Sequence, residues 1–539
     1  MKSMKKLVTL LLSLVMLCAL AMPAMAADAT TYSITINGAK GHKYTAYQVF
    51  DGAYYQGDGT NQTTNGTEYL SDVKWGKDVD GDKILEELHK NALLKASFEG
   101  KTSAEDVAYV LQGYGNKSKE LDEFARIVGK NLKTGATGKS SAVVGDDKKA
   151  KIDGLTAGYY FVKDTGTIGT DEIATKFLVK VVGNATVDIK ADAPTIEKKI
   201  VDNNVDTNHT SANIGDQVEF KLTAKVPDMA NFDTYTFTIS DTLSKGLTFD
   251  KASVVVKIGE TTLVANNNYT LTEPANPDAD NTFKIDFTKE QLGDNVEHTT
   301  GATIVVTYKA TLNSNALTTD KETNTAKLEY SNNPSSSTDK GTITTPDVPT
   351  YIYNFNIDVD KYDGTDGTTN TDKKLKDAVF VLYKKDGKDG TDKKYYKWDK
   401  DSKKVEWVSE ADKTTATPKT TDENGKATFE GLKEGTYYLE ETTAPKGYNT
   451  LKEPVKVTIG AAYNADGTLD TDNANFKLKP NTEKNNHYYQ VQSIANKAGA
   501  VLPSTGGIGT TIFYVLGSIL ALGAAVLLIA KKRMNGQDR

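Results

Sequence analysis

The sequence is almost without cysteine: Cys18 is the only one in 539 residues. It stands in the apolar run Leu7 to Ala21, which follows three lysines and precedes the small-residue site Ala24-Met25-Ala26. This order is typical of a secretory signal peptide, so we expect residues 1–26 to be removed on export, and Cys18 with them. The exported chain then has no disulfide, and any covalent tie within it must come from other chemistry.

Histidine is also scarce, with five residues scattered along the chain. The sequence contains no HExxH motif, no defensible Ser/His/Asp arrangement and no phosphate-binding glycine loop, so it predicts neither an enzyme nor a cofactor. The stretch Asp78 to Asp82 superficially resembles a calcium loop, but Lys83 and His89 replace the required glycine and bidentate glutamate. A solvated turn is the better interpretation, and we predict no metal site.

Basic residues do not outnumber acidic ones, with 65 Lys and Arg against 72 Asp and Glu. The net charge is −7, and removal of the basic residues at the two ends leaves the exported part more acidic still. We therefore expect no nucleic-acid partner.

One other long apolar run occurs, Ile508 to Ala530, followed by the basic tail Lys531-Lys532-Arg533. Its length suffices to cross a bilayer, and the basic tail favours the cytoplasmic side. Immediately before it stands Leu502-Pro503-Ser504-Thr505-Gly506. The pentapeptide, apolar helix and basic tail in this order resemble the sorting signal of sortase substrates. The alternative is a simple membrane anchor with a chance pentapeptide.

This resemblance implies a secreted protein of a Gram-positive bacterium that is held transiently in the membrane and then linked to peptidoglycan at the cell-wall surface. The sortase would cleave between Thr505 and Gly506. Thr505 would then be the acyl donor, as a thioester on the cysteine of that enzyme.

The part between the two ends is long enough for three or four domains. Short β-branched and aromatic runs between turn residues predict a mainly β chain of tandem Ig-like, antiparallel β-sandwich domains: Phe237–Ile239, Thr303–Tyr308, Tyr351–Val359, Val379–Tyr383 and Val455–Ile459. Helical spacing predicts an insertion in the first domain, with Ser103 as a helix cap: Ile84–His89, Ala104–Leu111 and Leu121–Leu132.

Prolines mark two domain boundaries, because Pro194, Pro346 and Pro349 each precede an alternating segment that is typical of an opening strand. We expect a first domain at 27–192, a middle domain at 193–347 and a third domain at 348–500. The sorting signal, the transmembrane helix of the precursor and the basic tail occupy 502–539.

The third domain contains FEGLKEGTYYLEETTAPKGY from Phe429. This pattern resembles the collagen-adhesin B-type domain of Gram-positive pilins and adhesins, in which a first-strand lysine and a last-strand asparagine form an isopeptide bond assisted by a glutamate. The resemblance implies these roles for Lys361, Asn496 and Glu441. Alternation from Phe355 onward independently places Lys361 on the inward face, where burial would favour its neutral, nucleophilic amine. The alternative is an exposed lysine and a solvent-facing glutamate.

The middle domain resembles a pilin middle domain of the collagen-adhesin A-type, through its opening PTIEKKI, its ISDTL and its closing NTAKLEYSN. The resemblance implies a second internal bond, with Asn324 as acceptor and Asp241 as the buried acid. Parity with Ile196 and Ile200 favours Lys198 over Lys199 as the nucleophile.

The first domain resembles the amino-terminal domain of streptococcal-type backbone pilins, through Gly41 to Phe50 and Gly154 to Asp164. Lys163-Asp164 stands where the third-domain motif has its glutamate, so we predict no internal bond here. Such pilins carry a linking lysine near the end of this domain. The resemblance implies Lys190, although the tyrosine and proline of the family segment are missing.

Taken together, these resemblances imply the backbone subunit of a covalently polymerised, cell-wall-anchored pilus, or fimbria. The expected partners are a sortase, identical subunits and peptidoglycan, with ancillary pilins and host surface ligands left open. The alternative is a monomeric wall-anchored adhesin, which shares the sorting signal and the sandwich domains but needs no linking lysine.

Overall fold

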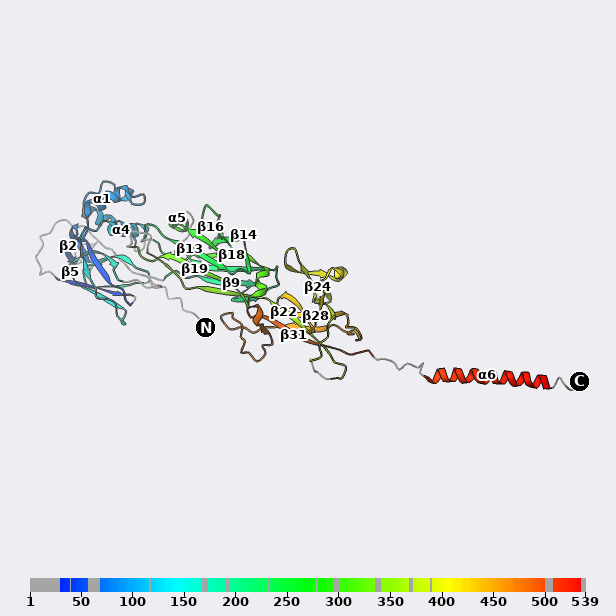
Figure 1. Ribbon diagram of the computed structural model, residues 1–539. Helices are drawn as coiled ribbons and strands as arrows, with labels where there is room; N and C mark the ends of the chain where they lie inside the picture. Colours follow the sequence, from blue (N-terminus) through cyan, green and yellow to red (C-terminus); the bar gives the residue numbers. More distant parts are fainter. Residues whose placement is uncertain are drawn as a thin grey trace.

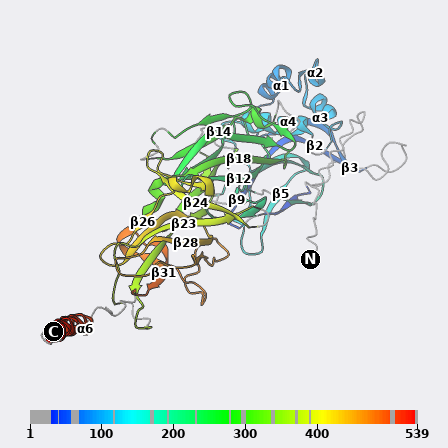
Figure 2. The same ribbon diagram turned by 90° about the vertical axis from the view of Figure 1, so that its right-hand side faces the viewer.

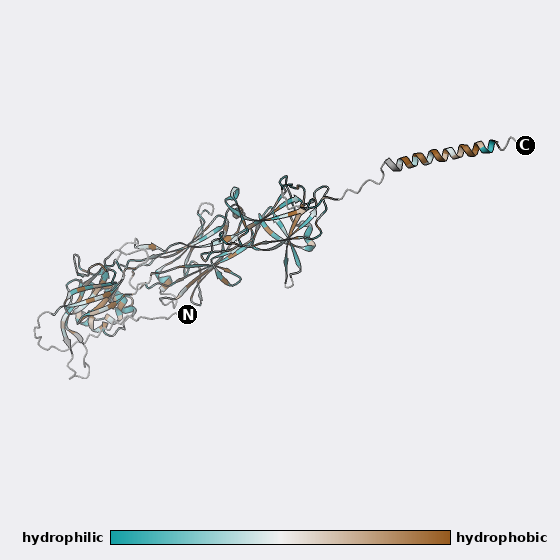
Figure 3. Cartoon of the chain, turned by 90° about the horizontal axis from the view of Figure 1, so that it is seen from below, coloured by the Kyte–Doolittle hydropathy of each residue, from teal (hydrophilic) through white to brown (hydrophobic). Residues whose placement is uncertain are grey.

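The computed structural model describes residues 30–38, 40–56, 68–115, 118–166, 173–189, 193–229, 232–274, 276, 280–293, 300–334, 341–367, 372–387, 390–499 and 508–534. Three β-rich domains follow one another along an elongated chain, and the helix α6 (Ile508–Met534) lies beyond the third (Figure 1). Figure 3 shows the same order from end to end, with apolar residues running along α6. The mainly β fold, the helices of the first domain and the carboxyl-terminal apolar helix are confirmed.

The first domain pairs two sheets with a group of helices. One sheet has the order β5 (Lys149–Leu155), β1 (Tyr32–Asn37) and β8 (Ala185–Asp188). The other has β3 (Glu68–Trp75), β2 (Tyr44–Gln56), β6 (Gly158–Asp164) and β7 (Lys176–Val181), with β4 (Lys139–Ser140) beside β2. The helices are α1 (Gly81–Lys90), α2 (Lys95–Phe98), α3 (Ala104–Leu111) and α4 (Lys119–Lys130), gathered at the end of the molecule away from α6 (Figure 2).

Local sequence explains the helical insertion. Ser103 caps α3 as predicted, because its hydroxyl accepts from the Asp106 backbone N–H while the Asp106 carboxylate accepts from the Ser103 N–H. On α4 the residues Leu121, Phe124 and Val128 form an apolar stripe that packs onto the second sheet.

The middle domain is a sandwich of two larger sheets. One has the order β10 (Val205–Thr207), β9 (Glu197–Asp202), β12 (Gln217–Lys225), β18 (Thr303–Leu312), β14 (Leu247–Ile258) and β15 (Thr261–Thr262). The other has β11 (His209–Ser211), β21 (Val348–Tyr353), β19 (Glu322–Ser331), β13 (Phe237–Leu243), β17 (Thr282–Phe287) and β16 (Thr270–Thr272), with β20 (Thr342–Thr344) beside β19. Two short helices, α5 (Lys289–Gly293) and η1 (Ser314–Thr318), connect strands.

The third domain repeats the two-sheet plan. One sheet has the order β27 (Lys426–Leu432), β22 (Phe355–Asp363), β31 (His487–Asn496) and β30 (Lys479–Asn481). The other has β25 (Lys404–Ser409), β24 (Asp392–Asp399), β23 (Val379–Asp386), β28 (Gly435–Thr443) and β29 (Val455–Ile459), with β26 (Lys419–Thr420) beside β23. The 3₁₀ helices η2 (Glu410–Thr415) and η3 (Thr482–Lys484) lie in connections.

The sheets are not antiparallel throughout. Strand β8 lies parallel to β1, β21 parallel to β11, and β31 parallel to β22. In the first and third domains this places the opening strand directly beside the closing strand. A side chain from each end of the domain can therefore meet within one sheet.

The predicted single strand Tyr351–Val359 is wrong: it is two strands that belong to different domains. Strand β21 pairs with β19 and β11 of the middle domain, whereas β22 opens the third domain. Asn354, between them, is buried and its Nδ2 donates to the Ala316 carbonyl oxygen at 2.9 Å. The chain therefore passes from the middle to the third domain at Asn354, whereas the prolines had placed the start of the third domain at residue 348.

The middle and third domains share one continuous hydrophobic core. Ile214 of the middle domain is fully buried; its N–H donates to the Gly431 carbonyl at 3.0 Å and its carbonyl accepts from the Val405 N–H at 2.8 Å. The first domain has separate cores and meets the middle domain through contacts such as the ion pair of Arg126 with Asp233, at 2.7 Å. The middle and third domains are therefore one packed unit.

Candidate functional site

A buried cluster in the third domain joins its first and last strands. Lys361 on β22 and Asn496 on β31 are at most 1% exposed, and Glu441 comes from β28 of the facing sheet. The Lys361 Nζ donates to Asn496 Oδ1 at 2.5 Å, and Asn496 Nδ2 donates to the two Glu441 oxygens at 2.9 and 3.1 Å. The amine thus lies on the acyl side of the amide, and the carboxyl group on the side of its nitrogen.

Electrostatics in this cluster favour a nucleophilic amine. Burial lowers the pKa of Lys361 to about 8, although the nearby Glu441 carboxylate acts in the opposite direction. Glu441 is fixed by a further contact, because its Oε2 accepts from the Leu451 N–H at 2.9 Å. The inward orientation of Lys361 that alternation predicted is present.

A second buried cluster crosses between the two sheets of the middle domain. Lys198 comes from β9, while Asp241 on β13 and Asn324 on β19 come from the facing sheet, and all three are at most 2% exposed. The Lys198 Nζ lies 2.5 Å from Asp241 Oδ2. Burial lowers the pKa of Lys198 to about 8 against the opposing effect of Asp241. Lys199 points elsewhere and donates to Asn208 Oδ1 at 2.7 Å, as strand parity predicted.

Sequence reasoning missed a fourth member of this cluster, Tyr308 on β18. Its hydroxyl lies 2.9 Å from the Lys198 Nζ, donates to Asp241 Oδ2 at 2.6 Å and accepts from Asn324 Nδ2 at 2.6 Å. The alternation of apolar residues along β18 could have shown that Tyr308 points inward, because it lies on the same buried face as Val306 and Ala310.

In the first domain, a buried carboxyl group pairs with an imidazole instead of an amine. Asp164 is the sixth residue after the glycine that opens β6, as Glu441 is after Gly435 in β28. Its carboxylate is buried and pairs with Nδ1 of His42. Lys163, next to it, is half-buried with its Nζ 5.3 Å from the centre of the Tyr47 ring. The sequence predicts no internal bond in this domain, and that stays a prediction.

Three of the sequence predictions lie outside the described residues: the linking lysine, the sorting pentapeptide and the signal peptide. Lys190 follows Ile189, the last described residue of this stretch, whose N–H donates to the Asn37 carbonyl oxygen at 3.0 Å. The pentapeptide is Leu502 to Gly506. Of the described helices, α6 alone is long and apolar enough to cross a membrane.

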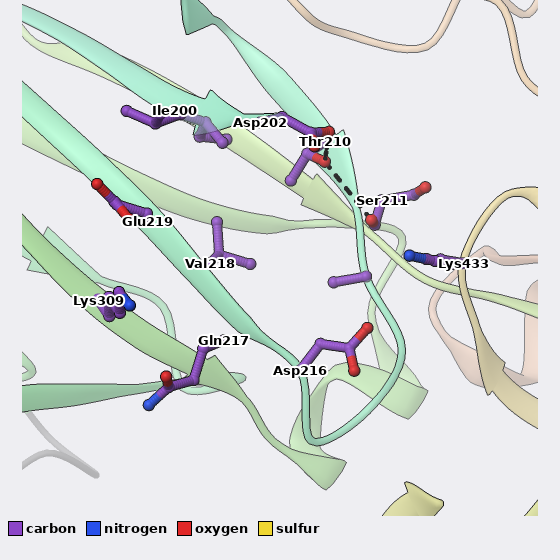
Figure 4. A pocket seen from close by; sticks show the side chains of 12 residues that line it. Ile200, Asp202, Thr210, Ser211, Asp216, Gln217, Val218, Glu219, Lys309 and Lys433 are labelled. Atoms are coloured by element: carbon purple, nitrogen blue, oxygen red, sulfur yellow. Dashed lines mark hydrogen bonds between the residues drawn. The ribbon is translucent and has the colours of Figure 1, made fainter. Parts of the chain in front are cut away.

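Among the described residues, no group of three or more His, Cys, Asp or Glu side chains could hold a metal ion. An open pocket of about 260 Å³ lies beside the junction of the middle and third domains, lined by residues of β9, β11 and β12 together with Lys309 and Lys433 (Figure 4).

Three protein-family models match the chain. One describes a Gram-positive pilin backbone subunit 2, Cna-B-like domain and matches residues 214–334. A prealbumin-like fold domain matches 355–475, and the LPXTG cell wall anchor motif matches 494–536. The Cna-B-like description of the middle domain differs from the A-type resemblance noted in its sequence.

Individual relatives share about a quarter or less of their residues with this chain. The trypsin-resistant surface T6 protein of Streptococcus pyogenes serotype M6 is 24% identical over 415 residues, which are 64% of this chain and 70% of that protein. The solved T6 backbone pilin of serotype M6 Streptococcus pyogenes is 19% identical, with 89% of this chain and 95% of that chain covered and a TM-score of 0.48. The pilus 2b backbone protein of group B streptococcus is 26% identical, with coverages of 58% and 99% and a TM-score of 0.40.

Proposed function

We propose that this chain, which is a Gram-positive pilin backbone subunit anchored to the cell wall through its LPXTG motif, closes two of its domains by internal Lys–Asn isopeptide bonds and is joined head to tail to identical chains by a sortase. The protein is structural and non-enzymatic, and it is exposed at the cell surface.

One observation carries the internal bond: Lys361 Nζ lies 2.5 Å from Asn496 Oδ1 while Glu441 contacts the amide nitrogen. The neutral amine attacks Asn496 Cγ, and the amide nitrogen takes up a proton with the help of Glu441 and leaves as ammonia. The products are one Lys–Asn amide and one ammonia, so no oxidant or cofactor is required. Lys198, Asn324 and Asp241 support the same reaction in the middle domain.

A bond at this place suits a subunit without cysteine. Lys361 and Asn496 are near the two ends of the third domain, so their cross-link restrains almost the whole domain in the unfolded state. In a fibre under tension the load would pass along β22 and β31, which lie side by side and parallel.

For the fibre itself, Thr505 is the acyl donor and Lys190 the acceptor. In the sequence, Lys190 follows β8, the last strand of the first domain, whereas Thr505 lies between the third domain and α6. Joining two unlike ends is a heterologous contact that does not close, which produces an open fibre rather than a ring. The partners are a sortase, identical subunits and peptidoglycan. Ancillary pilins and host surface ligands are further candidate partners.

Intact-mass spectrometry of the secreted ectodomain tests the internal bonds. We expect a mass lower than that of the sequence by two molecules of ammonia. Glu441→Ala should restore the mass of one ammonia. Lys199→Ala is the matched control and should restore none. A wild-type ectodomain with its full sequence mass would exclude both bonds.

Cell-wall extracts boiled in SDS test the polymer. We expect a ladder of this protein in the wild type and a collapse to monomer in Lys190→Ala, with secretion and the internal bonds unchanged. A single wall-linked band in the wild type would instead identify a monomeric adhesin, and an undiminished ladder in Lys190→Ala would point to another lysine.

A further inference from the structure

The two buried clusters differ in how the carboxyl group reaches the amide nitrogen of the asparagine. In the third domain Glu441 contacts the asparagine amide nitrogen directly, at 2.9 and 3.1 Å. In the middle domain the acid is Asp241, one methylene shorter, and the group that contacts the Asn324 amide nitrogen is the hydroxyl of Tyr308. That hydroxyl donates in turn to Asp241 Oδ2, at 2.6 Å. A tyrosine hydroxyl therefore fills the gap between the acid and the nitrogen that must leave.

We propose that Tyr308 is a catalytic residue of the middle-domain bond, whose hydroxyl passes a proton from Asp241 to the departing nitrogen of Asn324. This inference rests on the proposed Lys198–Asn324 bond. It adds a fourth reacting group to that site.

Bond formation at this site moves one proton through the acid and the tyrosine to the leaving nitrogen. The neutral Lys198 amine attacks Asn324 Cγ, and the proton that the amine loses goes to Asp241, 2.5 Å away. Asp241 returns a proton to the Tyr308 oxygen while the tyrosine gives its own hydroxyl proton to Asn324 Nδ2. The Cγ–Nδ2 bond breaks, ammonia leaves, and both Tyr308 and Asp241 end in the protonation state in which they began.

The surroundings hold Tyr308 in place for this role. Its ring is 1% exposed and packs among three phenylalanines, with ring centres 5.2 Å from Phe220, 5.8 Å from Phe249 and 4.8 Å from Phe283. Burial, and then the charge of Asp241, raise its pKa well above the ordinary value for tyrosine. The hydroxyl consequently stays protonated, as a relay requires.

Unmatched polar atoms mark the site as one arranged for reaction. Within the described residues, Asp241 Oδ1 and Asn324 Oδ1 are buried without a hydrogen-bond partner. A buried polar atom without a partner costs free energy, typically about 1–3 kcal/mol. Lys198 Nζ, Asp241 Oδ2 and Asn324 Nδ2 all lie within 3 Å of the single Tyr308 oxygen.

The test is the rate of bond formation in Tyr308→Phe, followed by mass spectrometry of tryptic peptides while ectodomain recovered unfolded and unlinked from inclusion bodies is folded. Loss of one general acid–base group typically slows a reaction about 100-fold or more, and we expect that loss for the middle-domain bond. The third-domain bond of the same molecules should form at the wild-type rate, which shows that the chain has folded. Tyr235→Phe is the matched control, because the Tyr235 hydroxyl is buried in the same domain without a hydrogen-bond partner among the described residues.

A second variant separates catalysis from packing. In Asp241→Glu/Tyr308→Phe, the longer carboxyl group extends into the space left by the hydroxyl and contacts Asn324 itself, as Glu441 contacts Asn496. We expect this double variant to recover most of the lost rate. Wild-type speed in Tyr308→Phe, or no recovery in the double variant, would overturn the relay. A wild-type middle domain without any bond would instead contradict the proposed function on which the relay depends.

Discussion

Replacing Glu441 by glutamine should leave the third domain folded but without its cross-link. The amide of Glu441→Gln has nearly the same shape as the carboxyl group, and an amide oxygen in the place of Oε2 can still accept from both Asn496 Nδ2 and the Leu451 N–H. It cannot exchange a proton with the departing ammonia. The variant therefore removes the chemistry while it preserves most of the packing.

The size of the stability loss follows from the loop that the bond closes. Lys361 and Asn496 are 135 positions apart in the sequence. In the chain-entropy model, a cross-link across a loop of that length stabilises the folded state by about 5 kcal/mol at 25 °C. For a domain of this size, that loss corresponds to a melting temperature lower by about 10–20 °C.

Differential scanning calorimetry of the ectodomain measures this loss, with intact mass recorded on the same samples. Glu440→Gln is the matched control: Glu440 neighbours Glu441 on β28 but accepts from the Lys413 Nζ, at 2.6 Å, on a partly exposed face. Loss of that surface pair should cost at most about 1 kcal/mol. A Glu441→Gln protein that still lacks two ammonia molecules would remove Glu441 from the chemistry. A variant that lacks the bond but melts within a few degrees of wild type would refute the entropic argument.

Three further results are expected. Lys198→Ala should abolish the middle-domain bond and Lys199→Ala should keep it; a tryptic peptide that joins Lys199 to Asn324 would mean that the strand register slips by one residue. When ectodomain recovered unfolded and unlinked is folded, the third-domain bond should form faster as the pH rises toward about 8 and then level off, because Lys361 reacts only as the neutral amine; a rate independent of pH would contradict this. Burial and the charge of Asp228 raise the pKa of Asp122 to about 6, so the folded first domain binds this proton more tightly than the unfolded chain. Its stability should fall as the pH rises from the unfolded value near 3.8 to 6, and Asp122→Asn should remove that slope and raise the melting temperature at pH 7.

The sequence predicted the parts of the clusters that depend on strand alternation and local motif. Period-two geometry was enough to place Lys361 inward and to choose Lys198 over Lys199, because both strands carry apolar residues at alternate positions. The cap at Ser103 was predictable for the same reason, since a helix start is a local property.

Long-range partners could not be predicted in the same way. Tyr308 lies inward on its own strand, but its contacts with Asp241 and Asn324 depend on how two sheets face each other. The pairing of His42 with Asp164 likewise joins residues far apart in the chain. The change of domain at Asn354 was hidden because β21 and β22 follow each other with one residue between them and read as a single apolar run.

The branched peptide from purified cell-wall fibres tests the central claim most directly. Tryptic digestion and tandem mass spectrometry should yield a peptide in which the Thr505 carbonyl is joined to the Lys190 amine, together with the internal Lys361–Asn496 peptide. Fibres in which Thr505 is found only on peptidoglycan, with Lys190 unmodified, would contradict the account of this chain as a subunit joined head to tail through these residues.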